Sequence, residues 1–298
     1  DLRDYMNGAE LVVAEPVVSY RETISIESTS INLSKSPNKH NRLYVTVEPM
    51  NSELCGDIEE GKVKVKPLIT EEKDQVRYLV DTYGVNADYF SKRMWAYGPT
   101  DKNANVMINA TQGTAYMAEI RDSCKSGFVW ATGSGPLCEE EVRGVAIKIE
   151  DVVLHADAIH RGMGQIGPTM RRVVLGSIML AQPRLQEPIF LAAITVPQEN
   201  TGGVFRVLSA RRGIMVNTTS GSGNPMCSIE AHLPVAESFG FDTDLRGATG
   251  GTAFAQCTFS HWQTMESDPL VEGTLANAVV TKVRERKGLP PMKPADYY

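Results

Sequence analysis

The chain has 298 residues, of which 42% are hydrophobic and 22% charged, so its composition predicts about two globular domains with apolar cores. The 30 Lys and Arg are outnumbered by 36 Asp and Glu, giving a net charge of −6. This balance excludes a general nucleic-acid-binding protein, because attraction to phosphates requires a local excess of cations. Any contact with nucleic acid must therefore come from local patches.

Cysteine use and hydropathy indicate the compartment. The five cysteines are widely spaced and form no CxxC pair, which is typical of a reduced, cytoplasmic protein. No apolar stretch reaches the length of a membrane span, so no membrane partner is expected. The chain begins with Asp1 rather than methionine, and we expect it to be part of a longer protein.

The first part of the chain mixes strands and helices. Pro16 follows a short apolar run and marks a boundary. After it, period-two alternation predicts strands and 3.6-residue periodicity predicts helices. The predicted strands are 24–33, 43–47, 106–110 and 145–154, and the predicted helices are 70–83, 86–95, 113–127 and 170–180. Pro168 is expected in the first turn of the last helix.

A polar loop joins the first two predicted strands. Residues 34–42 carry three cations, one histidine and two asparagines, with no apolar anchor. This is either a basic hairpin tip suited to phosphate and ribose contacts or a merely soluble turn. The candidate contact residues are Lys35, Ser36, Pro37, Asn38, Lys39, His40 and Asn41.

A second polar loop, residues 154–165, joins a predicted strand to a predicted helix. Its glycines permit a tight turn with positive φ, which predicts an exposed, bent tip. His155, Asp157, His160 and Arg161 suggest metal binding, acid–base chemistry or a solvated loop. The two histidines are five residues apart, unlike a helical zinc pair, and no metal is predicted. A hydrolase using His155, Asp157 and His160 would need a nucleophile or metal that the sequence does not offer.

The second part of the chain follows another rhythm. Residues 182–188, with two prolines, predict a linker. The elements that follow have the order βαββαβ, the split-βαβ or ferredoxin-like pattern. They are strands at 189–196, 213–217, 226–233 and 253–259, and helices at 202–211 and 238–246. A last helix is predicted at 275–287. Arg206, Arg211 and Arg212 form a basic group that is either solvated or bound to RNA.

Four motifs carry a resemblance to a known family. HADAIHRG at 155–162 and SPNKHNRLY at 36–44 resemble two loops of domain IV in the eukaryotic elongation factor 2 family, the ribosomal translocase. GGVFRVLSARRG at 202–213 and LPVAESFGF at 233–241 resemble its domain V. The family usually has three glycines after the His-Arg pair, whereas Met163 takes the place of the middle one here.

The resemblance implies an α+β fold. Residues 1–16 would end domain III or form a linker, and 17–182 would form domain IV, of the ribosomal-protein-S5-like β-α-β type, with tip loops at 34–42 and 154–165. Residues 183–260 would form a ferredoxin-like domain V. Residues 261–298 would be a C-terminal helix and tail that return to pack on domain IV.

The resemblance also implies a role in translation elongation. Domain IV would enter the decoding site of the small subunit, and its tip would contact ribosomal RNA and the tRNA–mRNA duplex. The contact residues would be the candidates of the first polar loop together with His155, Asp157 and Arg161, of which Asp157 and Arg161 would also shape or flank their loop. His160 would be modified to diphthamide, the ADP-ribose acceptor for diphtheria-type toxins. Partners would be the ribosome, the diphthamide-synthesis enzymes and those toxins, with Arg206, Arg211 and Arg212 on the large subunit.

No GxxxxGK[ST] loop is present in the sequence. We therefore expect no catalytic residue and no cofactor in this chain, with GTP and Mg held by a GTPase domain of the parent protein. The alternative is a paralogue of the same architecture in ribosome biogenesis or the spliceosome, against which both tip motifs argue.

Overall fold

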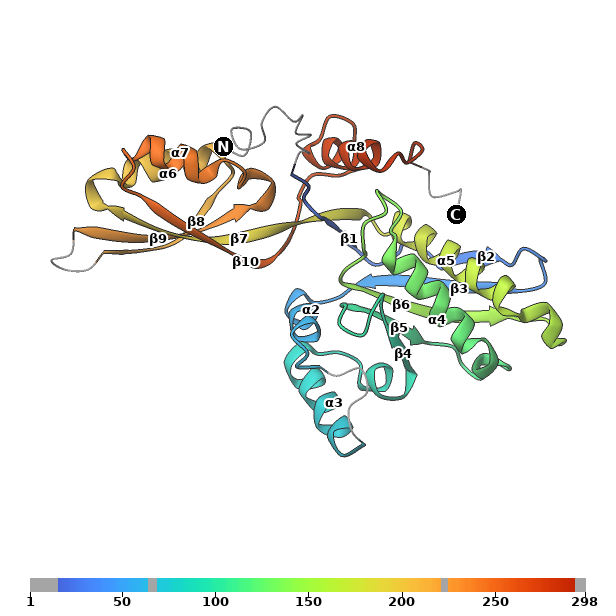
Figure 1. Ribbon diagram of the computed structural model, residues 1–298. Coiled ribbons are helices and arrows are strands. Elements are labelled where there is room, and N and C mark those ends of the chain that lie inside the picture. The colour runs from blue at the N-terminus through green and yellow to red at the C-terminus, as the bar shows by residue number, and fades with distance from the viewer. Residues whose placement is uncertain (1–15, 64–68, 221–224, 293–298) are drawn as a thin grey trace, which may run out of the picture. The chain divides into compact units, whose positions relative to one another are not determined.

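The computed structural model describes residues 16–63, 69–220 and 225–292, and its fold is of mixed α+β type with two sheets (Figure 1). Contacts divide the chain into two compact units. Of the described residues, the large unit comprises 20–63, 69–186 and 264–292, and the small unit comprises 16–19, 187–220 and 225–263. The predicted end of a preceding domain, residues 1–16, lies outside the described residues except for Pro16.

The sheet of the large unit contains a β-α-β element. Its strands lie in the order β2 (Asn32–Lys35), β3 (Arg42–Pro49), β6 (Val145–Val153), β5 (Asn105–Asn109), β4 (Met94–Tyr97). Only β5 and β6 run parallel, and they are joined through helix α4 (Met117–Gly133); the other neighbours are antiparallel. The predicted β-α-β architecture is therefore confirmed.

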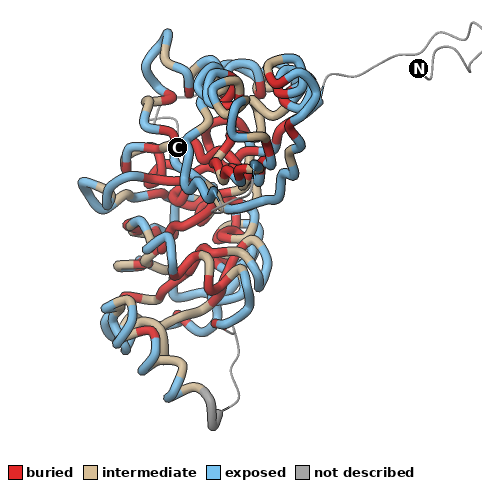
Figure 2. Tube along the Cα trace, turned by 90° about the vertical axis from the view of Figure 1, so that its left-hand side faces the viewer, coloured by how far each residue is buried: buried red, intermediate tan, exposed pale blue. Residues whose placement is uncertain are grey.

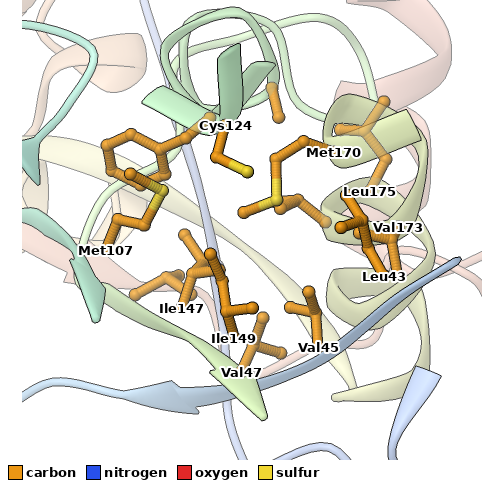
Figure 3. Packing of buried hydrophobic residues seen from close by; sticks show 14 of the residues in the cluster. Leu43, Val45, Val47, Met107, Cys124, Ile147, Ile149, Met170, Val173 and Leu175 are labelled. Atoms are coloured by element: carbon orange, nitrogen blue, oxygen red, sulfur yellow. The ribbon is translucent and has the colours of Figure 1, made fainter. Parts of the chain in front are cut away.

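Both faces of this sheet are covered. Helices α4 and α5 (Met163–Leu180) lie over one face, and α2 (Ser52–Glu59) and α3 (Ile69–Tyr83) over the other (Figure 1). Because side chains alternate along a strand, Met107 faces α4 and α5 while Val106 and Ile108 face α2 and α3. Figure 3 shows the first layer, in which strand side chains meet helix side chains such as Cys124 and Met170. Figure 2 shows how buried positions (red) and exposed positions (pale blue) are distributed along the chain.

Two predicted elements of the large unit are wrong in part. The strand expected at 24–33 is divided into β1 (Arg21–Ile24), which pairs with β7, and β2, which pairs with β3. The chain changes sheets between them, so residues 25–31 bend instead of continuing a strand. The helix expected at 86–95 ends with a π-helical turn at Tyr89–Arg93, because Met94 begins β4. Helix α2 was not predicted.

Helix α5 begins earlier than expected. It starts at Met163, not Met170, so Pro168 lies inside the helix beyond its first turn. The carbonyl of Gly162 accepts hydrogen bonds from the amides of Gln165 and Ile166, at 2.9 and 3.1 Å. This cap places the helix N-terminus within the predicted loop. Helix α4 is also displaced, to 117–133 from the expected 113–127.

The small unit has the ferredoxin-like order. Its sheet runs β10 (Phe254–Thr264), β7 (Pro183–Pro197), β9 (Met226–Pro234), β8 (Ile214–Ser220). Helices α6 (Thr201–Ala210) and α7 (Phe241–Ala248) cover one face (Figure 1). The predicted βαββαβ pattern is confirmed. The predicted linker at 182–188 is wrong, because residues 183–186, which belong to the large unit, begin β7 and pair with β1 of the same unit.

The C-terminal helix α8 (Leu275–Lys287) packs on the large unit, as expected. Lys287 Nζ donates to the carbonyls of Cys138 and Glu139 at 2.9 and 2.8 Å, and Arg284 donates to the Leu137 carbonyl. These carbonyls belong to the loop of residues 137–140, which Glu22 of β1 also holds. The Glu22 carboxyl group accepts from the amides of Leu137, Cys138 and Glu140. The amides of this loop thus bind β1, and its carbonyls bind α8.

All five cysteines are free, and four of them are buried. Within the described ranges, no helix is long and apolar enough to cross a membrane.

Candidate functional site

Strand register brings the two polar loops together. In the sheet of the large unit, Arg42 at the start of β3 lies opposite both Lys35, the end of β2, and Val153, the end of β6. The hairpin loop (residues 36–41) and the histidine loop (residues 154–162) therefore leave the sheet at the same end. We call this pair of loops the tip.

Two asparagines of the hairpin loop tie it to the histidine loop. Asn41 is fully buried; its Nδ2 donates to the His160 carbonyl at 2.7 Å, and its Oδ1 accepts from the His155 amide at 3.1 Å. Asn38 Nδ2 donates to the same His160 carbonyl at 2.8 Å, and the Asn38 amide donates to Gln165 Oε1 at 3.0 Å. The backbone of His160 is thus fixed by two side chains that lie more than a hundred residues away in sequence.

Three imidazoles gather at the tip. The ring centroids of His155 and His160 are 4.5 Å apart, and His40 of the hairpin loop lies 5.1 and 5.0 Å from them. His155 Nδ1 accepts from the Asp157 amide at 3.1 Å, so a neutral His155 carries its proton on Nε2. Asp157 Oδ1 in turn caps Ile159, opening the short 3₁₀ turn Ala158–Arg161.

No group of three His, Cys, Asp or Glu side chains in the described part of the chain is arranged to hold a metal ion. The tip instead presents ring edges and hydrogen-bonding groups.

Arg161 lies inside the tip, contrary to its predicted place at an RNA contact surface. It is 7% exposed and donates to the carbonyls of His155 and Ala156 at 2.8 and 2.7 Å. It also pairs with Glu119 of α4 at 2.6 Å, and its guanidinium lies 4.0 Å from the ring centroid of Tyr116. Arg161 Nη1 satisfies two carbonyls of the curved loop, while Nε and Nη2 donate to the Glu119 carboxylate. The planar fork of the guanidinium makes both contacts possible and explains why this side chain is internal.

Ser36 and Asn41, two other predicted contact residues, are also buried. Ser36 Oγ donates to Asn38 Oδ1 at 2.5 Å and accepts from the Asn41 amide at 2.9 Å. Both side chains hold the hairpin loop in shape. Sequence reasoning missed Gln165, Glu119 and Tyr116, and an isolated acid, amide or tyrosine gives no signal of such a role.

The remaining predicted tip residues are accessible. Lys35, Pro37, Lys39, His40 and Asp157 are exposed, and Asn38, His155 and His160 are half-buried. Ile159, which was not predicted as a candidate, is 82% exposed at the tip.

Gly162 and Gly164, the glycines of the predicted loop 154–165, do not have the expected positive φ. Gly162 has φ −68° and Gly164 lies within α5, whereas Lys39 in the hairpin loop has φ 64°. The side chain of Met163 runs along α5, with its Cε 3.5 Å from where a Cβ of Gly167 would lie.

The predicted basic group of the small unit is largely neutralised. Arg211 pairs with Asp244 at 2.5 Å and donates to two carbonyls, while Arg212 pairs with Glu187 at 2.5 Å. Arg206 is exposed on α6. The three arginines therefore do not form one patch of free positive charge.

Comparison with known families then assigns both units. Residues 61–182 match the family model of elongation factor G, domain IV, and residues 184–272 match that of the elongation factor G C-terminus. The chain belongs to the elongation factor G family. It is part of a translation elongation factor, and the large and small units correspond to domain IV and the C-terminal domain. Membership implies interaction with the ribosome. The histidine loop lies within the domain IV match, and the hairpin loop precedes it.

Proposed function

We propose that this chain supplies domains IV and V of an elongation factor 2-type translocase, and that its tip enters the decoding site while tRNA and mRNA move. The observation that carries this proposal is the junction at His160, where HADAIHRG and SPNKHNRLY meet through Asn38 and Asn41. Both motifs resemble the eukaryotic factor, and they form one hydrogen-bonded unit.

The electrostatics of the tip suit RNA. Lys35 and Lys39 are exposed, and the N-terminus of the 18-residue helix α5 opens at the tip with no acidic residue in its first turn. Helix N-termini carry a positive partial charge that favours phosphates. A-form RNA presents riboses and base edges in a shallow minor groove, which a compact hydrogen-bonding tip can contact without reading sequence. A translocase needs this tolerance because every codon must pass.

His160 is the proposed diphthamide and ADP-ribose acceptor. Its backbone is fixed by two side-chain hydrogen bonds, while its ring is half-buried against His40 and His155. Diphthamide would extend the imidazole with a carboxamide and a quaternary ammonium, adding reach and positive charge. The Met163 side chain lies near Gly167 of α5, and we therefore expect it not to prevent modification of His160.

The remaining parts of the proposal follow from this role. The factor would act in the cytoplasm, with GTP and Mg held by another domain, and this chain alone would not hydrolyse GTP. In the small unit, Arg206 is the strongest candidate for contact with large-subunit RNA, because Arg211 and Arg212 are paired with carboxylates. The diphthamide-synthesis enzymes and diphtheria-type toxins would be its modifying partners.

The alternative is a same-architecture paralogue of ribosome biogenesis or the spliceosome. It would keep both units but have no use for a diphthamide loop, so the state of His160 distinguishes the two.

The deciding experiment is the mass of the peptide covering His160, from protein isolated from its own organism. If the chain is part of a translocase, we expect the peptide to carry the added mass of diphthamide on His160. We also expect a diphtheria-type toxin to ADP-ribosylate that residue. His160→Ala should abolish labelling, whereas Arg206→Gln, a variant far from the tip in sequence, should not. An unmodified His160 that the toxin cannot label would favour the paralogue.

A further inference from the structure

A second candidate site lies on the large unit, in a cavity of about 370 Å³. Trp130 of α4, Arg171 and Arg172 of α5, and Arg284 of α8 line it, and we call these four residues the arginine groove. Pro37 of the hairpin loop lines it as well. None of the four groove residues belongs to the tip.

The groove carries positive charge that the protein does not neutralise. Three other arginines of this unit, Arg143, Arg161 and Arg184, each lie within 3.1 Å of a carboxylate oxygen. Across the described ranges, by contrast, no carboxylate pairs with Arg171, Arg172 or Arg284. Arg172 and Arg284 donate to Ser34 Oγ and to backbone carbonyls, contacts that position a guanidinium without cancelling its charge.

Glu139 is the one carboxylate residue among those that line the cavity. Three unpaired cations therefore face one anion, which makes the groove complementary to an anionic ligand.

Arg171 and Trp130 contact each other in the lining of the groove. The guanidinium carbon of Arg171 lies 4.4 Å from the ring centroid of Trp130, a cation–π contact. Arg171 Nε is buried and has no hydrogen-bond partner in the described part of the chain. The guanidinium of Arg171 therefore carries positive charge that no carboxylate in the described part of the chain offsets. Trp130 is 54% exposed, so its indole is available for stacking.

We propose that the arginine groove binds single-stranded RNA, with a phosphodiester on Arg171, Arg172 and Arg284 and a base stacked on Trp130. Cationic grooves with aromatic platforms bind single strands in this way. The choice of RNA over other anions rests on the proposed function. Pro37 makes the groove continuous with the hairpin loop, so one RNA segment can pass from the tip into it.

The test uses the indole itself as the reporter. The chain has three tryptophans, so replacing Trp95 and Trp262 by phenylalanine leaves Trp130 as the only one. Titration with a single-stranded RNA of about ten nucleotides should quench Trp130 fluorescence. Arg171→Gln should weaken binding about five- to tenfold and reduce the slope of log K against log salt by about 0.7.

Arg121→Gln is the matched control. It removes the same charge from an exposed position on α4, outside the groove, and should leave affinity unchanged. Equal losses for the two variants would overturn the proposal, because they would indicate only a general effect of net charge.

Three further arms separate the sources of binding. An abasic strand should bind more weakly and give little quenching, whereas inorganic pyrophosphate should compete only at high concentration. If pyrophosphate or a polyglutamate peptide bound as tightly as RNA, the groove would be a general anion or peptide site and the proposal would fail.

Lys39→Asn removes a tip cation at a left-handed position that asparagine tolerates. It should weaken ribosome binding under the proposed function and leave most of the Trp130 quenching intact. If RNA did not quench Trp130 but Lys39→Asn weakened ribosome binding, the RNA site in the groove would be rejected and the proposed function of the tip would stand. If RNA quenched Trp130 but Lys39→Asn left ribosome binding unchanged, the role of the tip would be rejected and the groove would stand.

Discussion

Asn41→Ala should loosen the tip more than any other single truncation in the hairpin loop. The side chain is fully buried and makes two hydrogen bonds to the histidine loop, at 2.7 and 3.1 Å. Each is worth about 1 kcal/mol, and the His155 amide left without an acceptor adds about 1–3 kcal/mol. The His160 carbonyl keeps its bond from Asn38. The expected loss is roughly 3–5 kcal/mol, or about 6–20 °C in Tm for a unit of this size.

Thermal unfolding followed by circular dichroism measures the stability, and hydrogen exchange of a peptide covering residues 154–162 measures the tip. Asn105→Ala is the matched control. Asn105 is also fully buried and makes three hydrogen bonds, to Gly98, Val142 and Val145. Both variants should lose comparable stability, but only Asn41→Ala should speed exchange in the histidine loop under native conditions. Equal exchange in the two variants, or a negligible change in Tm for Asn41→Ala, would refute the reasoning.

Three other changes have defined outcomes. His160→Ala should alter the free energy of unfolding by less than about 1 kcal/mol, because its half-buried ring is not what joins the loops; a larger loss in urea titration would contradict this. Arg161→Met should cost about 2–4 kcal/mol and Arg161→Lys should recover less than half, since lysine lacks the fork that reaches Glu119 and two carbonyls; full recovery by lysine would be inconsistent with that role. Burial raises the pKa of Glu22 from 4.5 to about 7 in the folded protein, against the lowering by three backbone amides. The stabilising contribution of protonated Glu22 is thus complete below pH 4.5 and is lost as pH rises through about 7. Between pH 4.5 and about 7, the free energy of unfolding should fall by up to about 3 kcal/mol more in the wild-type protein than in Glu22→Gln. If the free energy of unfolding of the two proteins changed in parallel with pH, this expectation would be wrong.

The fold was predictable where one pattern dominated. Four elements appear within one residue of their expected bounds, namely the helices at 70–83 and 275–287 and the strands at 106–110 and 145–154. Each has either a long periodic apolar pattern or a run of apolar residues that become buried. Short elements failed for a physical reason. An apolar run such as Met94–Tyr97 fits a helix or a strand equally well, and only pairing with β5 decides it. Pro183 and Pro188 predict a linker at 182–188, yet residues 183–186 pair with β1.

The candidate site was likewise predictable only in part. Polarity and loop position were enough to select both loops, yet they could not distinguish a side chain that faces solvent from one that holds the loop. Asn41 and Arg161 are as polar as Lys39 and Asp157, but the first two are buried. Their direction depends on acceptors supplied by the other loop, by α4 and by the curved backbone, which no local pattern encodes. Polar residues in the tip therefore have two roles. The buried ones fix the conformation of the loops, and this conformation determines the positions of the exposed ones.

The arginine groove shows the same dependence on tertiary structure. Its cations come from α5 and α8, more than a hundred residues apart, and its aromatic platform comes from α4. In sequence, Arg171 and Arg172 are two ordinary cations on a helix, and the net charge of −6 argues against a general RNA-binding protein. What distinguishes them is the lack of a carboxylate partner in the described part of the chain, while Arg143, Arg161 and Arg184 each have one. A chain with acidic balance can thus hold local positive charge by leaving particular arginines unpaired, and this is where its RNA contacts should be sought.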